Sequence, residues 1–84
     1  MELPAPVRAC VAEHLRLVDQ RRPGLLEALH LVGSVALGEY RPGVSDIDMV
    51  AITARPLDDD DLAALADIHA AIPRYDGIYL DRAT

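Results

Sequence analysis

The sequence predicts an α/β fold in which helices cover a small β-sheet, and three patterns lead to this prediction. Two long stretches carry apolar residues at helical spacing. Three short stretches are apolar or β-branched enough to form strands. The two kinds alternate along the chain in the order α-β-α-β-α-β, once a short helical turn is counted. The 84 residues are therefore expected to form a single domain over residues 1–84.

The first helix is predicted over residues 5 to about 20. Apolar side chains recur there at helical spacing, which indicates one buried face. That face is expected to consist of four residues: Val7, Val11, Leu15 and Val18. Pro6 suits a first helical turn, and the Pro-Gly pair in "RRPG" ends the helix in a turn.

A strand, a short helical turn and a loop are predicted next. The apolar run over residues 25–32 is expected to end in a short buried strand that closes on Gly33. Residues 34–38, "SVALG", have room for one or two helical turns, with Ser34 as the N-cap. The following "EYRPGVS" is predicted as a loop, because its Pro-Gly pair cannot continue a helix.

The second half of the chain predicts a strand, a long helix and a last strand. Residues 46–53 are apolar and β-branched apart from two aspartates, which indicates a strand. "LDDDDLAALADIHAAIP" indicates a helix, whose acidic first turn complements the helix dipole. Its apolar stripe is expected to consist of Leu62, Leu65, Ile68 and Ile72. "YDGIYLD" is predicted as a third short strand.

Composition narrows the classes of function. The net charge is −6 and all eight basic residues are Arg, so a protein that coats duplex nucleic acid is not expected. Without Lys the chain has neither a Walker-type phosphate loop nor a Schiff-base lysine. Its single cysteine, Cys10, cannot form an internal disulfide. No apolar run approaches a signal peptide or a membrane span, so no membrane association and a cytoplasmic location are expected.

Asp46 and Asp48 stand two residues apart in a segment that is otherwise apolar. On a strand they project to the same side, and two ionised carboxylates so placed need a proton, an Arg or a divalent cation between them. Two aspartates in a strand lower the stability of the fold, and residues that do so are commonly found at functional sites. The alternative is that both lie in the loop that enters the strand, where solvent and neighbouring N–H groups stabilise them. The pair alone leaves both interpretations open.

Gly33-Ser34 favours the functional interpretation of the two aspartates. An apolar strand that ends in Gly-Ser before a helical turn has the geometry to hold phosphate, because glycine lets the backbone come close and the serine hydroxyl donates. An ordinary strand-to-helix turn with a serine cap is the alternative. Phosphate donors and a carboxylate pair together are the two halves of a nucleoside triphosphate site.

A third acid is expected, because a two-metal site usually needs one more ligand or a base. The last strand offers Asp76 and Asp81, which alternation places on opposite faces. Asp76 shares its face with Ile78 and Leu80, and it is preferred because it lies at the beginning of the strand, where a polar side chain can meet the sheet's edge. The acids of residues 58–61 are interpreted as solvated charge at a helix N-terminus.

The remaining polar residues carry weaker signals. The three histidines are dispersed, and Cys10 with His14 supplies only two ligands on one helix, so packing or surface roles are expected. Arg41 has two open interpretations, a phosphate contact and a solvated loop charge. Tyr75 and Tyr79 could stack on a base, but a core position is expected in a chain without Phe.

The stretch "LVGSVALGEYRPGVSDIDMVAIT" resembles the signature of the polymerase-beta-like nucleotidyltransferase superfamily: an apolar residue, Gly-Ser, a spacer of about a dozen, then Asp-apolar-Asp-apolar. The spacer "ALGEYRPGVSDID" looks most like that of streptomycin/spectinomycin-type aminoglycoside adenylyltransferases. The resemblance spans roughly residues 7–82 and includes the "DGIYL" strand. It implies a nucleotidyltransferase-like α+β fold with a small mixed sheet.

The resemblance also implies an activity and its residues. Gly33 and Ser34 would bind the nucleoside triphosphate, and Asp46 and Asp48 would hold Mg²⁺ or Mn²⁺. Asp76 matches the family's third carboxylate, a metal ligand or the base. The reaction implied is in-line attack by a hydroxyl of a small molecule, such as an aminoglycoside, on the α-phosphorus of a nucleotide, with ATP expected as co-substrate, and release of pyrophosphate.

Family enzymes continue into a helical C-terminal domain, for which 84 residues leave no room. The sequence is therefore expected to lack that domain. Either the protein is truncated, or a homodimer or a separate helical protein completes the cleft, as in toxin–antitoxin pairs with minimal nucleotidyltransferases. The alternative function is a non-catalytic remnant or partner-binding module of the same fold.

Overall fold

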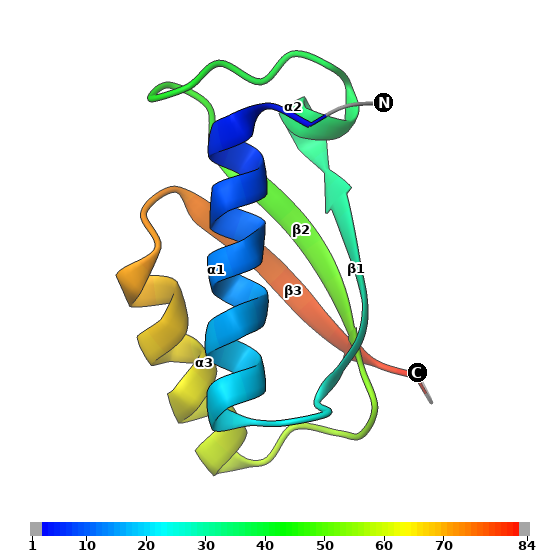
Figure 1. Ribbon diagram of the computed structural model, residues 1–84. Coiled ribbons are helices and arrows are strands. Elements are labelled where there is room, and N and C mark those ends of the chain that lie inside the picture. Colours follow the sequence, from blue (N-terminus) through cyan, green and yellow to red (C-terminus); the bar gives the residue numbers. More distant parts are fainter. Residues whose placement is uncertain (1–2, 83–84) are drawn as a thin grey trace.

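The computed structural model describes residues 3–82 (Figure 1). Six elements follow one another in these residues: α1 (Ala5–Arg21), β1 (Leu26–Val32), α2 (Gly33–Ala36), β2 (Ile47–Thr53), α3 (Asp59–Ala71) and β3 (Tyr75–Asp81). The predicted order α-β-α-β-α-β is therefore confirmed. None of the helices in residues 3–82 combines the length and the apolar character needed to cross a membrane.

The three strands form one mixed sheet in the order β1-β2-β3. β1 runs antiparallel to β2, and β2 runs parallel to β3 with α3 as the crossover between them. β2 is thus the central strand, and every residue of β3 from Tyr75 to Asp81 has a register partner on it. The predicted class, a small mixed sheet with helices packed on it, is confirmed.

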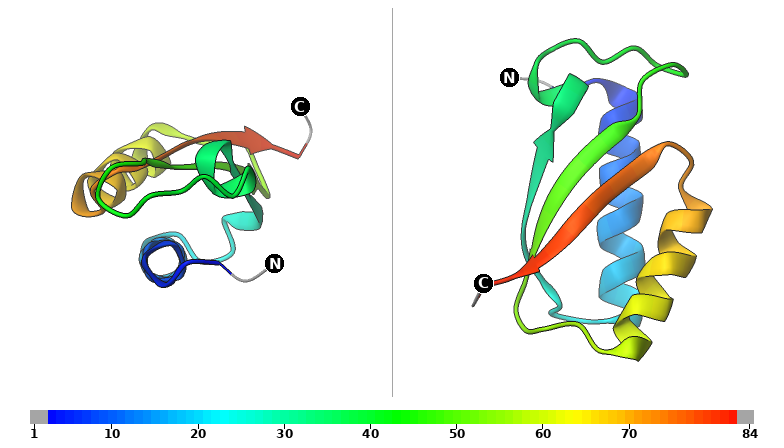
Figure 2. Two further views of the ribbon diagram at one scale, coloured as in Figure 1. Left: turned by 90° about the horizontal axis from the view of Figure 1, so that it is seen from above. Right: turned by 180° about the vertical axis from the view of Figure 1, so that it is seen from behind.

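α1 and α3 both lie on one face of the sheet, as the two views in Figure 2 show. The alternation along β2 follows from this, because Ile47, Met49, Ala51 and Thr53 are buried while the residues between them are half-buried. The core consists mainly of aliphatic side chains, as the absence of Phe and Trp requires.

Within residues 3–82 no long helix covers the opposite face of the sheet, and in the view from behind the strands lie in front of α1 (Figure 2). The side chains on this open face come from alternate positions of β2 and β3 and from their neighbours on β1. Ile78 is 56% exposed and Leu80 is 41% exposed there. We refer to it below as the open face.

The predicted apolar faces of the two long helices are partly wrong. In α1 the buried side chains are Val7, His14 and Val18, whereas Leu15 is exposed. In α3 Asp61 is buried and Leu62 is exposed. In each helix the buried residues share one stripe, and the leucine immediately after the buried polar residue is turned about 100° away from it. The polar residues are buried because each has partners in the interior.

Three predicted boundaries also change. β1 begins at Leu26 and is an edge strand with alternating exposure, not a fully buried one. α2 begins at Gly33, with Val32 as the N-cap and no side-chain cap, so the predicted Ser34 cap is wrong. β2 begins at Ile47, so Asp46 lies in the loop just before the strand. In this position the backbone of Asp46 accepts from the Ser34 hydroxyl, at 3.4 Å.

Candidate functional site

The Gly-Ser turn lies where β1 ends and α2 begins. Gly33 has a φ of +65°, a backbone conformation that residues other than glycine rarely adopt. A Cβ at this position would lie 2.7 Å from Oδ2 of Asp48, which is closer than real Cβ contacts come. The turn therefore requires glycine for two reasons, and its backbone lies directly against a carboxylate.

Asp48 and Asp76 are brought side by side by the sheet. They are register partners on the parallel strands β2 and β3, and Val32 is the partner of Asp48 on its other side. Neighbouring strands are about 4.8 Å apart, so the two aspartates project next to each other on the open face. Asp48 is half-buried and Asp76 is exposed. Asp81, the alternative third acid, lies at the other end of the strand pair, opposite Thr53.

The close pairing of β2 and β3 at this point depends on Gly77. A Cβ at Gly77 would collide with the carbonyl oxygen and the side chain of Met49. The residue that follows Asp76 is thus a glycine because the neighbouring strand leaves no room for a side chain. This close approach sets the distance between the two carboxylate-bearing segments.

Asp46 lies at the same end of the sheet as Asp48 and Asp76, but in the loop before β2. Its side chain is exposed, and Oδ1 is 3.6 Å from Nη1 of Arg74, the residue before β3. Its carbonyl oxygen accepts from the Ser34 hydroxyl at 3.4 Å. The structure therefore brings all five predicted site residues to one end of the sheet: Gly33, Ser34, Asp46, Asp48 and Asp76. Their roles stay predictions.

Two open hollows flank the Gly-Ser turn. One, of about 390 Å³, lies on the open face and is lined by both register-paired aspartates together with Val32, Val50 and Ile78. The other, of about 720 Å³, is polar and is lined by Ser34 and by loop residues that include Tyr40, Arg41 and Ser45. Arg41 is exposed, and its backbone N–H donates to the Ser45 hydroxyl at 3.1 Å. Arg41 thus belongs to the loop that lines this hollow together with Ser34.

The donor set fits a hard divalent cation. Carboxylate oxygens are the ligands that Mg²⁺ and Mn²⁺ prefer, and the Gly33 position leaves open the space beside Asp48 Oδ2 that a Cβ would fill. In residues 3–82 no three His, Cys, Asp or Glu side chains are gathered closely enough to hold an ion on their own. Mg²⁺ usually takes only one or two carboxylates and completes its shell with phosphate oxygens and water. Asp46, Asp48 and Asp76 stay the predicted ligands, of which one or two would hold the ion together with phosphate oxygens and water.

Asp61 is buried and belongs to a separate ion-pair cluster, whereas the sequence predicted solvated charge for it. It accepts a two-point ion pair from Arg55, and Arg22 Nε lies 3.2 Å from its Oδ1. Asp58 and Asp61 also form a reciprocal capping box at the start of α3. Hydrogen bonds from the Arg55 side chain and then the Asp58 backbone hold the pKa of Asp61 well below its usual range. This cluster stabilises the fold at the end remote from the Gly-Ser turn.

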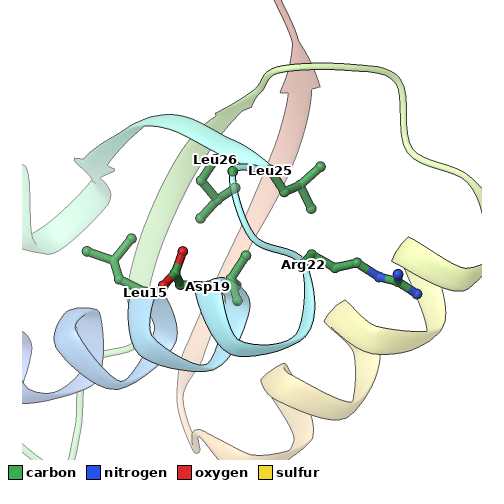
Figure 3. Close-up of a pocket in the computed structure, with 7 residues that line it drawn as sticks. Leu15, Asp19, Arg22, Leu25 and Leu26 are labelled. Carbon is green, nitrogen blue, oxygen red and sulfur yellow. The ribbon is translucent and has the colours of Figure 1, made fainter.

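A further pocket, of about 230 Å³, adjoins this end of the molecule (Figure 3). It lies between α1 and the start of β1, where Leu15 and Asp19 face Leu25 and Leu26. Arg22 contributes to its lining, but its guanidinium points away from the pocket toward α3. The pocket contains none of the predicted site residues.

Two histidines and two tyrosines form a hydrogen-bonded ring between α1, α3 and β3. Nδ1 of His69 lies 3.0 Å from the carbonyl oxygen of Tyr75, which can only accept, so this nitrogen carries the proton. The Tyr79 hydroxyl then donates to His69 Nε2 (2.6 Å) and accepts from His14 Nε2 (2.8 Å). The Tyr75 hydroxyl donates to His14 Nδ1 (2.8 Å), which closes the ring.

The surroundings of the ring keep His14 neutral. Burial, and secondly the neighbouring His69, lower the pKa of His14 from 6.5 to about 4. Burial likewise raises the pKa of Tyr75 and Tyr79 above the usual tyrosine range. The expectation that the tyrosines belong to the core is confirmed for Tyr75, and Tyr79 is half-buried against it.

Sequence reasoning missed both polar clusters for different reasons. The D-x-x-D spacing of Asp58 and Asp61 is a capping-box signal, and Arg55 stands three residues before it, so this cluster was open to prediction. The ring had no local signal, because His14 and Tyr79 are 65 residues apart. Only the packing of two helices on β3 brings its members together.

Comparison with known protein families places most of the chain in a known family. Residues 11–81 match the family model described as "Nucleotidyltransferase domain", which covers most of the chain. The matched range includes the Gly-Ser turn, all three predicted carboxylates and the strands that carry them. No curated protein matches the chain.

Proposed function

The chain belongs to the nucleotidyltransferase domain family, and on this premise we propose that it transfers a nucleoside monophosphate, AMP from ATP, to a hydroxyl of a small molecule such as an aminoglycoside. The observation that carries the proposal is the position of Asp48. It lies between the Gly33 backbone and Asp76, so the proposed triphosphate turn and two carboxylates meet at one point of the sheet.

The Gly-Ser turn is proposed to bind the triphosphate. Gly33 lets a phosphate approach the backbone because it has no side chain, and its φ of +65° already holds the turn in the required shape. The Ser34 hydroxyl makes only a long hydrogen bond to the Asp46 carbonyl, at 3.4 Å, so it can exchange this acceptor for a phosphate oxygen. Arg41 is near enough to the same hollow to contact the phosphates as well.

The three aspartates are proposed to hold the metal and to manage the proton. Bound Mg²⁺ or Mn²⁺ would neutralise the charge that develops on the phosphates. Asp46 and Asp48 would hold the cation beside the triphosphate, and Asp76 accepts the proton of the attacking hydroxyl. The acceptor oxygen forms a bond to the α-phosphorus while the bond to the bridging oxygen breaks, and pyrophosphate leaves with that electron pair.

The open face is the proposed side from which the acceptor approaches. Asp76 is exposed there, at the rim of the hollow that also contains Asp48. A net charge of −6 attracts a cationic acceptor, which is the charge that an aminoglycoside carries. These features support a small cationic acceptor without naming the compound.

The test measures binding and transfer separately. Binding of Mn²⁺ with a non-hydrolysable ATP analogue is measured by calorimetry for the wild type, Asp46→Asn and Asp48→Asn, and transfer of labelled AMP is measured on a panel of aminoglycosides. We expect both variants to weaken binding at least about tenfold, because each removes a charged ligand. Asp60→Asn, an exposed acid at the start of α3, is the matched control and should bind as the wild type does.

Two outcomes would contradict parts of this proposal. Unchanged binding in both variants would show that the metal assignment is wrong. Binding that depends on Asp46 and Asp48, with no transfer to any acceptor, would instead favour a non-catalytic module of the same fold.

A further inference from the structure

Arg74 has an unusual backbone for its residue type. It lies between α3 and β3 with a φ of +57°, and among the described residues it is the one non-glycine with a positive φ. A side chain in this left-handed region is sterically disfavoured, so the surrounding structure must hold it there. Its carbonyl oxygen accepts from the backbone N–H of Ile47 at 2.7 Å.

This backbone bond places Arg74 next to Asp46. Tyr75 pairs with Ile47 and Asp76 pairs with Asp48, and the bond from Ile47 extends the contact one residue beyond the start of β3. The residues immediately before the two strands therefore lie side by side. The left-handed turn thus places the guanidinium of Arg74 at the end of the sheet where Asp46, the first of the proposed metal ligands, lies.

The side chain of Arg74 is held loosely. Nη1 lies 3.6 Å from Oδ1 of Asp46 and donates to the carbonyl oxygen of Val44 at 3.2 Å. The two partners of the ion pair are 55% and 56% exposed, so water competes with the contact. Such a pair exchanges partners readily when a stronger ligand for either member arrives.

We propose that Arg74 is an exchangeable counter-ion of the nucleotide site. It pairs with Asp46 when the site is empty and binds the polyphosphate when metal and nucleotide fill it. This inference rests on the proposed function and adds a residue that positions the substrate. The Ser34 hydroxyl contacts the backbone of Asp46, so the proposed phosphate turn lies beside the carboxylate that Arg74 pairs with.

The exchange follows from charge. A divalent cation held at Asp46 would weaken the pairing of this carboxylate with the guanidinium of Arg74, because the ion carries the larger charge and competes for the same oxygens. The released guanidinium would then be available to the phosphate oxygens of a nucleotide at the Gly-Ser turn, which it can bind with two parallel N–H donors. Arg74 therefore opposes binding of the metal alone and favours binding of the metal with its nucleotide.

The experiment compares the two ligands in one set of variants. Arg74→Asn removes the charge but suits the left-handed backbone, since asparagine is enriched in that region, and Arg74→Lys keeps the charge. Calorimetry measures the affinity for Mn²⁺ alone and for Mn²⁺ with a non-hydrolysable ATP analogue, and circular dichroism checks that each variant is folded. Arg21→Asn is the control, because it removes the same charge from another exposed ion pair, with Asp67 at 3.3 Å.

Opposite changes are expected for the two ligands. Arg74→Asn should bind Mn²⁺ alone about two- to fivefold more tightly, which is the range of an exposed ion pair. It should bind the Mn²⁺–nucleotide complex at least about tenfold more weakly, since a charge-assisted contact to phosphate is lost. Arg74→Lys should recover part of the nucleotide affinity, and Arg21→Asn should change neither value.

The outcomes separate this inference from the proposed function. If the wild type binds both ligands but Arg74→Asn leaves both affinities unchanged, or shifts them in the same direction, the inference is wrong and the proposed function stands. If the wild type binds neither Mn²⁺ nor the complex, the proposed function is wrong and the inference is overturned with it.

Discussion

The backbone of Gly33 lies against the carboxylate of Asp48, so that a Cβ at position 33 would stand 2.7 Å from Asp48 Oδ2. This contact couples the first half of the predicted site to the second. A side chain at Gly33 would have to move the Asp48 side chain or open the turn. The same substitution would also place a residue other than glycine at a φ of +65°.

Gly33→Ala is therefore expected to lose nucleotide binding as well as stability. The left-handed backbone alone costs an alanine about 1 kcal/mol, and displacement of Asp48 adds to this. Stability is measured by urea unfolding, and binding by calorimetry with Mn²⁺ and a non-hydrolysable ATP analogue. We expect binding to fall at least about tenfold, because both the turn and the carboxylate change.

Gly24→Ala is the matched control for this prediction. Gly24 has a φ of +75° but nothing within 4 Å of its Cβ position, so alanine there meets only the backbone cost. It should lose about 1 kcal/mol of stability and bind the nucleotide as the wild type does. Equal losses of binding in the two variants would show that the contact with Asp48 does not matter.

Asp61→Asn is expected to destabilise the protein strongly. Asp61 is buried and pairs with two partly exposed arginines, and neutralising it removes the nearer counter-charge of Arg55 and the counter-charge of Arg22. We expect the Tm at neutral pH to fall by roughly 10 °C, since this is a small domain. Asp60→Asn, in the same first turn but exposed, should change the Tm by no more than a few degrees.

The ion pair of Asp61 with Arg55 also predicts how stability changes with pH. The pKa of Asp61 is lowered in the folded state, chiefly by the hydrogen bonds from Arg55, so the unfolded chain takes up the proton first as the pH falls. The stabilisation is therefore complete above about pH 4, the unfolded value for an aspartate, and is lost progressively below it. Asp61→Asn should remove this part of the acid dependence, and an unaltered acid limb in the variant would contradict the assignment.

His14 predicts a second loss of stability on acidification, in a higher pH range than that of Asp61. Its folded pKa is about 4 against 6.5 in the unfolded chain, so in this interval the unfolded state binds a proton that the folded state does not. The free energy of unfolding should therefore fall as the pH is lowered from 6.5 to about 4, by roughly 3 kcal/mol at most. Urea unfolding at several pH values measures this slope.

His14→Gln should flatten that slope, because the amide can accept from Tyr75 and donate to Tyr79 without titrating. His30 is exposed on β1, so His30→Gln serves as the control and should leave the slope as it is in the wild type. A slope that survives His14→Gln would assign the titration to another group.

The helices and strands of the fold, and the short motifs of the candidate site, could be predicted from local patterns. Helical spacing in α1 and α3, and the punctuation by Pro and Gly, act over a few residues, so the sequence carries them directly. The Gly-Ser turn and Asp46-x-Asp48 are also local, and Asp76 was chosen from the alternation of one strand. The buried faces of the helices were harder to predict. Their aliphatic side chains favoured Leu15 and Leu62, whereas the structure buries His14 and Asp61.

By itself, then, the sequence determined which segments are helices and strands and which short motifs could hold phosphate and metal. Only the tertiary structure decided that Asp76 stands beside Asp48, that Arg74 meets Asp46, and that two histidines and two tyrosines close a ring. The physical reason is the range of the interactions. Periodicity and turn propensity act between near neighbours, whereas register, burial and ion pairing depend on the free energy of packing segments that are far apart in the chain.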